Sequence, residues 1–241
     1  MNPVKFRKNG RYIRYDSDIF NNIEDVSFNS QVWARRSAIV GFAEGRATTF
    51  FIQHQGRDFV LRHYQRGGLV AKISSEHYLW LGLKFSRPWR EWVLLEKMQE
   101  KGLPVPIPAA IQVERKGIFY RADIMMHRIP HSRTLMKILM TEELSEGYWI
   151  TIGSVIRRFH EEGVYHSDLN ANNIMLDDGG RGYLIDFDKC GFRKPRLKWQ
   201  KENLLRLKRS LNKILKNEDI FYFSDENWRS LLRGYGWDDI L

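Results

Sequence analysis

The chain has 241 residues, of which 43% are hydrophobic, and a formal net charge of +10. This length suits one large domain or two small lobes, and 14 Phe, 10 Tyr and 8 Trp residues supply a substantial core. Cys190 is the only cysteine, which excludes an intrachain disulfide framework and fits a reducing compartment. The first residues lack the apolar run of a signal peptide, and no long apolar stretch follows. We therefore expect a soluble chain that acts in the cytoplasm.

Residues 1–40 predict an N-terminal extension packed on the first lobe. Basic, aromatic and polar residues alternate as far as Tyr15, and a helix is expected over 32–39. The alternative is an arm that contacts the substrate.

Residues 41–64 predict a strand, a turn and a second strand, with a loop containing Gly41 and Gly45 before the first full strand. Backbone amides of such a loop can hold phosphate groups. Two glycines are too few for a G-x-G-x-x-G motif, so a plain hairpin remains the alternative.

A helix is predicted over 85–102, because apolar residues recur near helical spacing between Pro88 and Gly102. Residues 102–108, GLPVPIP, cannot be helical because alternating prolines remove backbone donors. Strands follow at 109–113 and 118–126. Composition then changes from strand-rich to helix-rich, and we place a lobe boundary near 127–131.

Helices are predicted over 132–139 and 145–162, and Gly163 would end the second one. Its apolar face, which includes Ile152 and Phe159, is expected to lie in the core, and His160 is expected to be a packing residue.

The stretch from Val164 to Asp188 has the residues that metal-assisted phosphoryl transfer needs. One carboxylate must orient an acceptor hydroxyl and take its proton, and hard oxygen ligands must hold magnesium. Asp168 lies in a predicted loop, Asn173 follows five residues later, and Asp186 ends the next strand. A turn at 177–180, DDGG, would fold the two strands together and bring Asn173 close to Asp186. The alternative is a polar loop and hairpin unrelated to catalysis.

The positive charge is concentrated between residues 189 and 216. Glu202 is the only acidic residue there, against eleven basic residues, so the segment has the same net charge as the whole chain. Such a block predicts an anionic partner: phospholipid, phosphorylated glycolipid or nucleic acid. A helix is predicted over 199–216, with an apolar stripe through Leu204, Leu207 and Leu211. The stripe indicates a buried helix, a basic helix lying on a membrane, or both. A small helical cap is expected at 228–232.

The sequence HSDLNANN at 166–173, followed by IDF at 185–187, resembles the catalytic loop and D-F-G segment of protein kinases. Together with VLRHYQRGG at 60–68 and GLPVPIP at 102–108, it makes most of the chain similar to the lipopolysaccharide-core kinase family. The resemblance implies an α+β, bilobal, protein-kinase-like fold. Its antiparallel-sheet N-lobe would span 41–127 and its mainly helical C-lobe 128–241.

The same resemblance implies ATP and Mg²⁺ as cofactors, with Asp168 as the catalytic residue and Asn173 and Asp186 as metal ligands. Arg62 stands where kinases have a phosphate-gripping lysine, and Glu91 would hold it, although Glu96 and Glu100 compete for that role. The remaining candidate nucleotide-binding residues are Gly45 and Arg46. Two positions depart from the kinase pattern: Asn170 replaces a lysine of many Ser/Thr kinases, and Asp188, which we expect to be a turn residue, replaces the glycine of D-F-G.

The implied reaction is phosphate transfer to the 4-hydroxyl of 3-deoxy-D-manno-octulosonic acid (Kdo) on a lipid A precursor, in lipopolysaccharide core biosynthesis. The implied location is peripheral, on the cytoplasmic face of a bacterial inner membrane. Four basic residues would meet the glycolipid and the anionic membrane surface: Arg193, Arg196, Arg206 and Arg209. A kinase for another sugar, small molecule or protein is the alternative. A non-enzymatic nucleic-acid-binding protein would explain the charge but not the motif, so no nucleic acid is expected as a partner.

Overall fold

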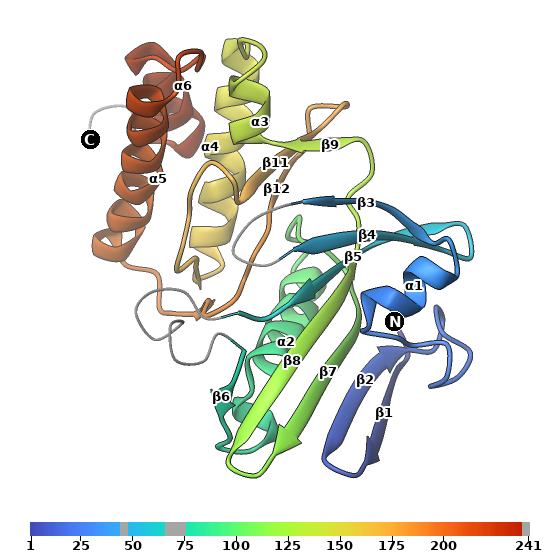
Figure 1. The fold of residues 1–241 in the computed structure, drawn as a ribbon. Coiled ribbons are helices and arrows are strands. Elements are labelled where there is room, and N and C mark those ends of the chain that lie inside the picture. The colour runs from blue at the N-terminus through green and yellow to red at the C-terminus, as the bar shows by residue number, and fades with distance from the viewer. Residues whose placement is uncertain (44–47, 66–75, 238–241) are drawn as a thin grey trace. The chain divides into compact units, whose positions relative to one another are not determined.

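The computed structural model describes residues 1–43, 48–65 and 76–237. The chain is α+β, with an antiparallel sheet and several helices, as the sequence predicted (Figure 1). It divides into two compact units. Unit 1 consists of Met1–Glu96 and Ile107–Arg128, and unit 2 of Lys97–Pro106 and Ile129–Leu241. No helix in the described ranges is long and apolar enough to cross a membrane.

Unit 1 is built on an eight-stranded sheet in the order β1-β2-β7-β8-β5-β4-β3, with β6 paired to β8 beside this path. All of the pairings are antiparallel. The strands are β1 (Pro3–Lys8), β2 (Arg11–Asp16), β3 (Ile39–Ala43), β4 (Thr49–His54), β5 (Arg57–His63), β6 (Tyr78–Leu79), β7 (Pro108–Lys116) and β8 (Phe119–His127).

The first forty residues are more than a packed extension, because β1 and β2 are strands of this sheet. Both faces of β2 are covered. Ile13 and Tyr15 lie in a core cluster that includes Trp33 of helix α1 (Ser30–Arg35). Arg14, on the other face, forms an ion pair of 2.6 Å with Glu96 of helix α2 (Arg87–Glu100). The predicted helix at 32–39 is thus found at 30–35, and the residues after it lead into β3.

Unit 2 contains the helices α3 (Leu135–Leu139), α4 (Glu146–Glu161), α5 (Leu197–Asn217) and α6 (Asp225–Tyr235). Its strands form a three-stranded sheet, β12-β11-β9, and a two-stranded sheet, β10-β13. Their bounds are β9 (Ser132–Thr134), β10 (Val164–Tyr165), β11 (Ile174–Asp177), β12 (Gly182–Leu184) and β13 (Gly191–Phe192). The helix predicted over 132–139 is shorter than expected, because its first three residues pair with β11.

Helices α4 and α6 approach each other closely at two glycines. A Cβ on Gly153 would overlap the carbonyl oxygen of Leu231, and a Cβ on Gly234 would overlap that of Ile150. The hydroxyl of Ser154 donates to the Gly234 carbonyl at 3.1 Å. The two glycines therefore allow the backbones of α4 and α6 to pack directly against each other, and α4 is the helix that leads into the predicted catalytic loop.

Candidate active site

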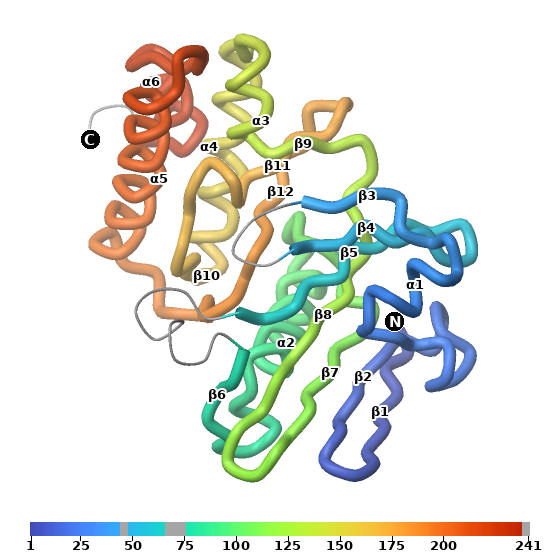
Figure 2. The backbone as a smooth tube through the Cα atoms, in the orientation of Figure 1, coloured from blue at the N-terminus to red at the C-terminus, as the bar shows by residue number. Residues whose placement is uncertain are grey.

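The predicted catalytic loop begins where α4 ends, and Figure 2 traces the backbone from α4 through β10 to β11 and β12. Gly163 follows the helix with a φ of +75°, and a Cβ there would overlap the carbonyl oxygen of Arg193. Its own carbonyl accepts from the Arg193 N–H at 2.7 Å. Only glycine combines this backbone conformation with such a close approach. The chain can therefore turn directly from the helix into β10, which pairs with β13.

The β11–β12 hairpin brings Asn173 and Asp186 together. Ile174 lies opposite Leu184, and the N–H of Ile185 donates to the carbonyl of Asn173 at 3.0 Å. Asp186 is therefore the next residue after the one paired with Asn173. The hairpin predicted from the turn at 177–180 is present.

Asn173 also connects the hairpin to the loop before it. Its side-chain Nδ2 donates to the carbonyl of Asp168 at 2.8 Å, and the Asn173 side chain is almost fully buried. Asp168 itself is exposed and Asp186 is half-buried. The three residues predicted from the sequence thus lie in one continuous hydrogen-bonded segment of unit 2, with the Asp168 carboxylate accessible to a substrate.

His166 links the two ends of this segment. Its Nδ1 accepts from the N–H of Asp168 at 3.2 Å, and its Nε2 lies 2.9 Å from the carbonyl oxygen of Ile185. These two contacts require the neutral ring with its proton on Nε2. Burial of the ring, which is 1% exposed, lowers the pKa of His166 and favours the same neutral form. A neutral imidazole therefore joins the residue before Asp186 to the backbone of Asp168.

The turn after Asp186 is tied back to the loop. Asp186 has a φ of +61°, and the buried Phe187 stacks on Phe159 of α4 and meets the His166 ring edge-on. The Asp188 carbonyl accepts from the Ser167 hydroxyl at 3.1 Å, so the backbone of Asp188 is part of the turn. An aspartate in a left-handed conformation costs free energy, and the surrounding contacts hold it in place.

Asn173 and Asp186 supply the donor set that Mg²⁺ prefers. Because the Asn173 Nδ2 is used by the Asp168 carbonyl, the amide oxygen Oδ1 is directed to other partners. Together with the Asp186 carboxylate it offers hard oxygen ligands, and Mg²⁺ is commonly bound by one or two protein groups plus substrate phosphates. The residues present therefore fit a magnesium ion delivered with a nucleotide.

Arg62 and Glu91, both in unit 1, form a buried ion pair. The Nη2 of Arg62 on β5 lies 2.7 and 2.8 Å from the two carboxylate oxygens of Glu91 on α2. The Tyr64 hydroxyl donates to the same carboxylate at 2.5 Å. Burial, reinforced by the Glu91 charge, raises the pKa of Tyr64 well above its ordinary value, so this hydroxyl stays protonated and keeps donating. The carboxylate thus fixes the position of the Arg62 cation.

The other predicted site residues are placed as follows. Gly45 and Arg46 lie outside the described residues. Arg193, Arg196 and Arg209 are exposed, and the Arg193 guanidinium lies over the Tyr165 ring at 3.4 Å from its centroid. Arg206 is half-buried and close enough to His166 for its charge to contribute to the lowered pKa of that ring. The structure therefore places two of the four cations, Arg193 and Arg206, near the predicted catalytic loop.

Asn203 is a residue of the site that the sequence interpretation missed, whereas His160 is the packing residue that it predicted. Asn203 on α5 is fully buried, and its Oδ1 accepts from the backbone N–H of His166 at 3.3 Å. His160 on α4 lies 2.8 Å from the Tyr235 hydroxyl, and burial lowers its pKa to about 4. One feature of the sequence could have identified Asn203: it is a polar residue on the buried face of the helix, one turn after Trp199 and one turn before Leu207.

These side chains indicate a class of protein: a phosphotransferase, because a carboxylate, an amide and a second carboxylate follow the spacing used for metal-assisted transfer from a nucleotide. Comparison with known proteins identifies the family. A model of the lipopolysaccharide kinase (Kdo/WaaP) family matches residues 30–235, and the chain belongs to this family.

Curated relatives are similar over almost the whole chain, and each is named 3-deoxy-D-manno-octulosonic acid kinase. The protein from Mannheimia succiniciproducens is 43% identical, over 86% of this chain and 89% of the relative. The protein from Photobacterium damsela subsp. piscicida is 39% identical, over 92% of both chains. The protein from Haemophilus influenzae strain PittEE is 36% identical, over 96% of this chain and 98% of the relative.

Proposed function

We propose that this protein is an ATP-dependent kinase that phosphorylates the 4-hydroxyl of the Kdo sugar on a lipid A precursor, in lipopolysaccharide core biosynthesis. The principal support is the meeting of Asp168, Asn173 and Asp186 in one hydrogen-bonded segment of a chain that belongs to the lipopolysaccharide kinase family. The names of its relatives support the choice of the Kdo sugar as acceptor.

In this proposal the exposed Asp168 carboxylate orients the sugar hydroxyl and accepts its proton as the oxygen attacks the γ-phosphate. Asn173 and Asp186 would hold Mg²⁺, which supplies charge neutralisation to the phosphate oxygens when it is bound. His166 keeps the two carboxylate-bearing segments in register through its contacts with Asp168 and Ile185. Transfer then depends mainly on positioning, because phosphoryl transfer needs little covalent chemistry from the protein.

Arg62 and Glu91 extend the proposal to unit 1. Arg62 would grip the α- and β-phosphates of ATP, with Glu91 fixing its guanidinium. A guanidinium is as suitable as the usual ammonium for this task, because its planar fork matches phosphate oxygens. Gly45 and Arg46 would cover the phosphates. Units 1 and 2 would then be the N-lobe and C-lobe of a protein-kinase-like fold, with the boundary near residues 127–131.

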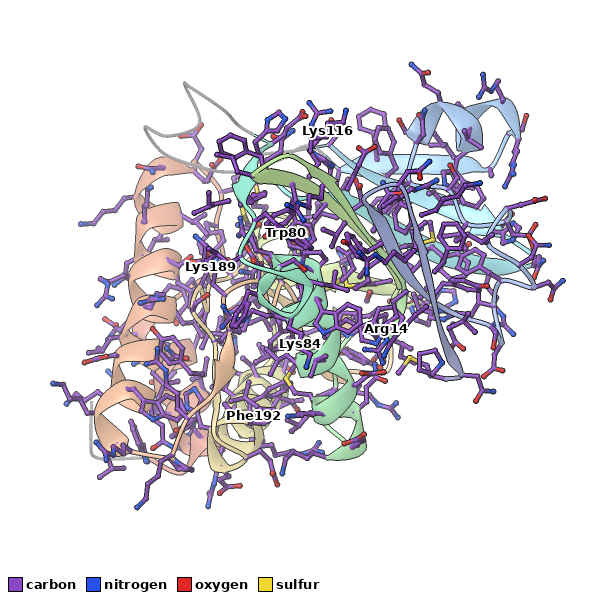
Figure 3. All side chains as sticks on the ribbon, turned by 90° about the horizontal axis from the view of Figure 1, so that it is seen from below. Arg14, Trp80, Lys84, Lys116, Lys189 and Phe192 are labelled. Atoms are coloured by element: carbon purple, nitrogen blue, oxygen red, sulfur yellow. The ribbon has the colours of Figure 1, made fainter. Side chains whose placement is uncertain are left out.

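A membrane-facing surface in unit 2 is part of the proposal. Phe192 and Leu197 are 39% and 68% exposed, and the exposed cations Arg193 and Arg196 lie between them in the sequence (Phe192 is labelled in Figure 3). Apolar and basic residues in this mixture suit the interface of an anionic bilayer. The segment directly follows the Asp186 turn, so we propose that it brings the site to a glycolipid acceptor on the cytoplasmic face of the inner membrane.

The direct test is phosphate transfer from labelled ATP to a set of acceptors: Kdo-lipid A precursor, free Kdo, other sugars and a general protein substrate. We expect transfer to the Kdo acceptors alone, and its loss in Asp168→Ala. Asp178→Ala is the matched control, because Asp178 is an exposed carboxylate in the turn of the same hairpin. Preferred transfer to another acceptor would contradict the Kdo assignment, whereas an active Asp168→Ala variant would contradict the assignment of the base.

A further inference from the structure

Five large apolar side chains are exposed at one end of unit 1. Their exposed fractions are 52% for Leu79, 69% for Leu81, 67% for Phe85, 65% for Ile118 and 43% for Phe119. They come from two segments, 79–85 and 118–119, and we call them the tip patch. A group of this size is unusual on a soluble surface, where large apolar residues are mostly scattered singly.

The two segments of the tip patch lie side by side. β6 pairs with the first residues of β8, with Leu79 opposite Phe119, and the Trp80 N–H donates to the carbonyl of Ile118 at 2.8 Å. Figure 1 shows β6 beside the end of the β7–β8 hairpin. Opposite residues in an antiparallel pair point to the same face, so Leu79 and Phe119 share one face, whereas Ile118, opposite Trp80, lies on the other. Exposed apolar side chains therefore stand on both faces at this end of the pair.

The tip patch is mounted on a well-packed base. The Trp80 ring stacks on Tyr12 at 5.4 Å between centroids and meets Tyr120 edge-on. The backbone N–H of Arg87, just beyond Phe85, donates to the Tyr120 hydroxyl at 3.1 Å. These contacts hold both segments in place, so the exposed side chains extend from a fixed frame.

Basic residues surround the apolar ones. Lys84 is exposed within the first segment, and Arg115 and Lys116 are exposed just before the second; residues 79–85 and 115–119 contain no Asp or Glu. The Arg115 guanidinium lies over the Trp80 ring at 5.4 Å from its centroid. In Figure 3, Trp80 lies between the labelled Lys116 and Lys84. The surface is therefore both apolar and positively charged.

We propose that the tip patch inserts into the interface of an anionic lipid bilayer. Ile118 and Phe119 lie at the β7–β8 turn and Phe85 on the short helical turn Leu83–Phe85, which are projecting elements that can enter the boundary between headgroups and acyl chains. Lys84, Arg115 and Lys116 bind lipid phosphates, because each basic residue near such a surface adds attraction. An acidic protein would match the charge but would need a matching apolar hollow for each projecting side chain.

This site is additional to the proposed docking residues, which belong to unit 2. It rests on the proposed function only in that a glycolipid acceptor brings the protein to a membrane. The exposure and charge of the tip patch do not depend on which acceptor is phosphorylated.

The test uses the full-length protein and sedimentation with vesicles of phosphatidylcholine, with and without phosphatidylglycerol. We expect Leu81→Ser/Ile118→Ser to weaken partitioning onto anionic vesicles by about tenfold or more, because two large apolar side chains no longer insert. Lys84→Glu/Lys116→Glu should weaken it by at least about fivefold for each cation removed, an effect confined to anionic vesicles and reduced by salt. Val40→Ser/Ile220→Ser is the control, since these residues are 51% and 58% exposed outside the tip patch.

A second measurement reports insertion directly. A polarity-sensitive fluorophore on Ile118→Cys should shift to the blue on anionic vesicles, while the same label on Ile220→Cys should not. The native Cys190 is buried, so labelling is selective. Equal partitioning of the tip-patch and control variants, or no shift at position 118, would overturn the inference. Transfer to Kdo-lipid A precursor and to free Kdo in the same variants tests the proposed function separately: its absence with both acceptors in every variant and in the wild type would contradict that function and leave the vesicle result standing.

Discussion

Removing the Glu91 carboxylate tests the buried ion pair that fixes Arg62. The Glu91 side chain is 1% exposed, and it accepts from the Arg62 guanidinium and from the Tyr64 hydroxyl. Removing one member of a buried ion pair costs about 3–5 kcal/mol, and depriving a buried hydroxyl of its acceptor costs about 1–3 kcal/mol more. Because the Arg62 side chain is 19% exposed and can turn toward water, we expect the lower part of this range.

Glu91→Ala should therefore lower the free energy of unfolding by about 4–5 kcal/mol, measured by urea denaturation with an unchanged m-value. Glu100→Ala is the control, because Glu100 is exposed on the same helix and its loss should change stability by about 0.5 kcal/mol or less. In Arg62→Lys the KM for ATP should rise less than in Arg62→Met, since a point charge is kept. A Glu91→Ala variant as stable as Glu100→Ala, or equal KM values in the two Arg62 variants, would refute this reasoning.

Three further predictions concern packing, pH and positioning. Gly147→Ala should stabilise the protein by about 0.5–1 kcal/mol, because Gly147 is exposed at the start of α4. Gly153→Ala should destabilise the protein by about 1–3 kcal/mol, because the added Cβ meets the backbone of α6. Thermal unfolding that shows equal stability for the two variants would contradict the packing of α4 against α6. The hydrogen bond to Asp123 raises the pKa of His63. The stability difference between wild type and His63→Gln should therefore be full below about pH 6.5 and should shrink as the pH rises through the raised pKa of the folded protein. A stability difference independent of pH would be evidence against this hydrogen bond's effect. Asn203→Ala should lower kcat more than it raises the KM for ATP, with partial rescue in Asn203→Asp, whose carboxyl oxygen can accept the same loop N–H; a loss of stability without a change in kcat would show a purely structural role.

The sequence predicted elements well where one local signal was strong. The turn at 177–180 and the apolar residues beside it predicted the β11–β12 hairpin, and three-four spacing predicted α2, α4 and α5. β1 and β2 were not predicted as strands of the sheet. The reason is that β2 is buried on both faces, so its polar Arg14 and Asp16 are inside and the usual apolar-polar alternation is absent.

In the candidate site, too, local features were predictable from the sequence and contacts between distant residues were not. The spacing of Asp168, Asn173 and Asp186 was visible in the motif, because the loop and hairpin are contiguous in sequence. The choice between Glu91 and Glu96 depends on which face of α2 meets which strand: Glu91 binds Arg62 on β5, whereas Glu96 binds Arg14 on β2. Asn203 reaches the loop from a helix 37 residues further along the chain, and its contact with the loop arises only from tertiary packing.

The most direct measurement is the binding of Mn²⁺ with ATP, followed by electron paramagnetic resonance, alongside transfer to the Kdo acceptor. We predict that Asp186→Asn and Asn173→Ala lose metal–nucleotide binding and transfer together, whereas Asp168→Asn keeps the binding and loses the transfer. Transfer at the wild-type rate in Asp168→Asn, or unchanged metal–nucleotide binding in both Asp186→Asn and Asn173→Ala, would contradict the account.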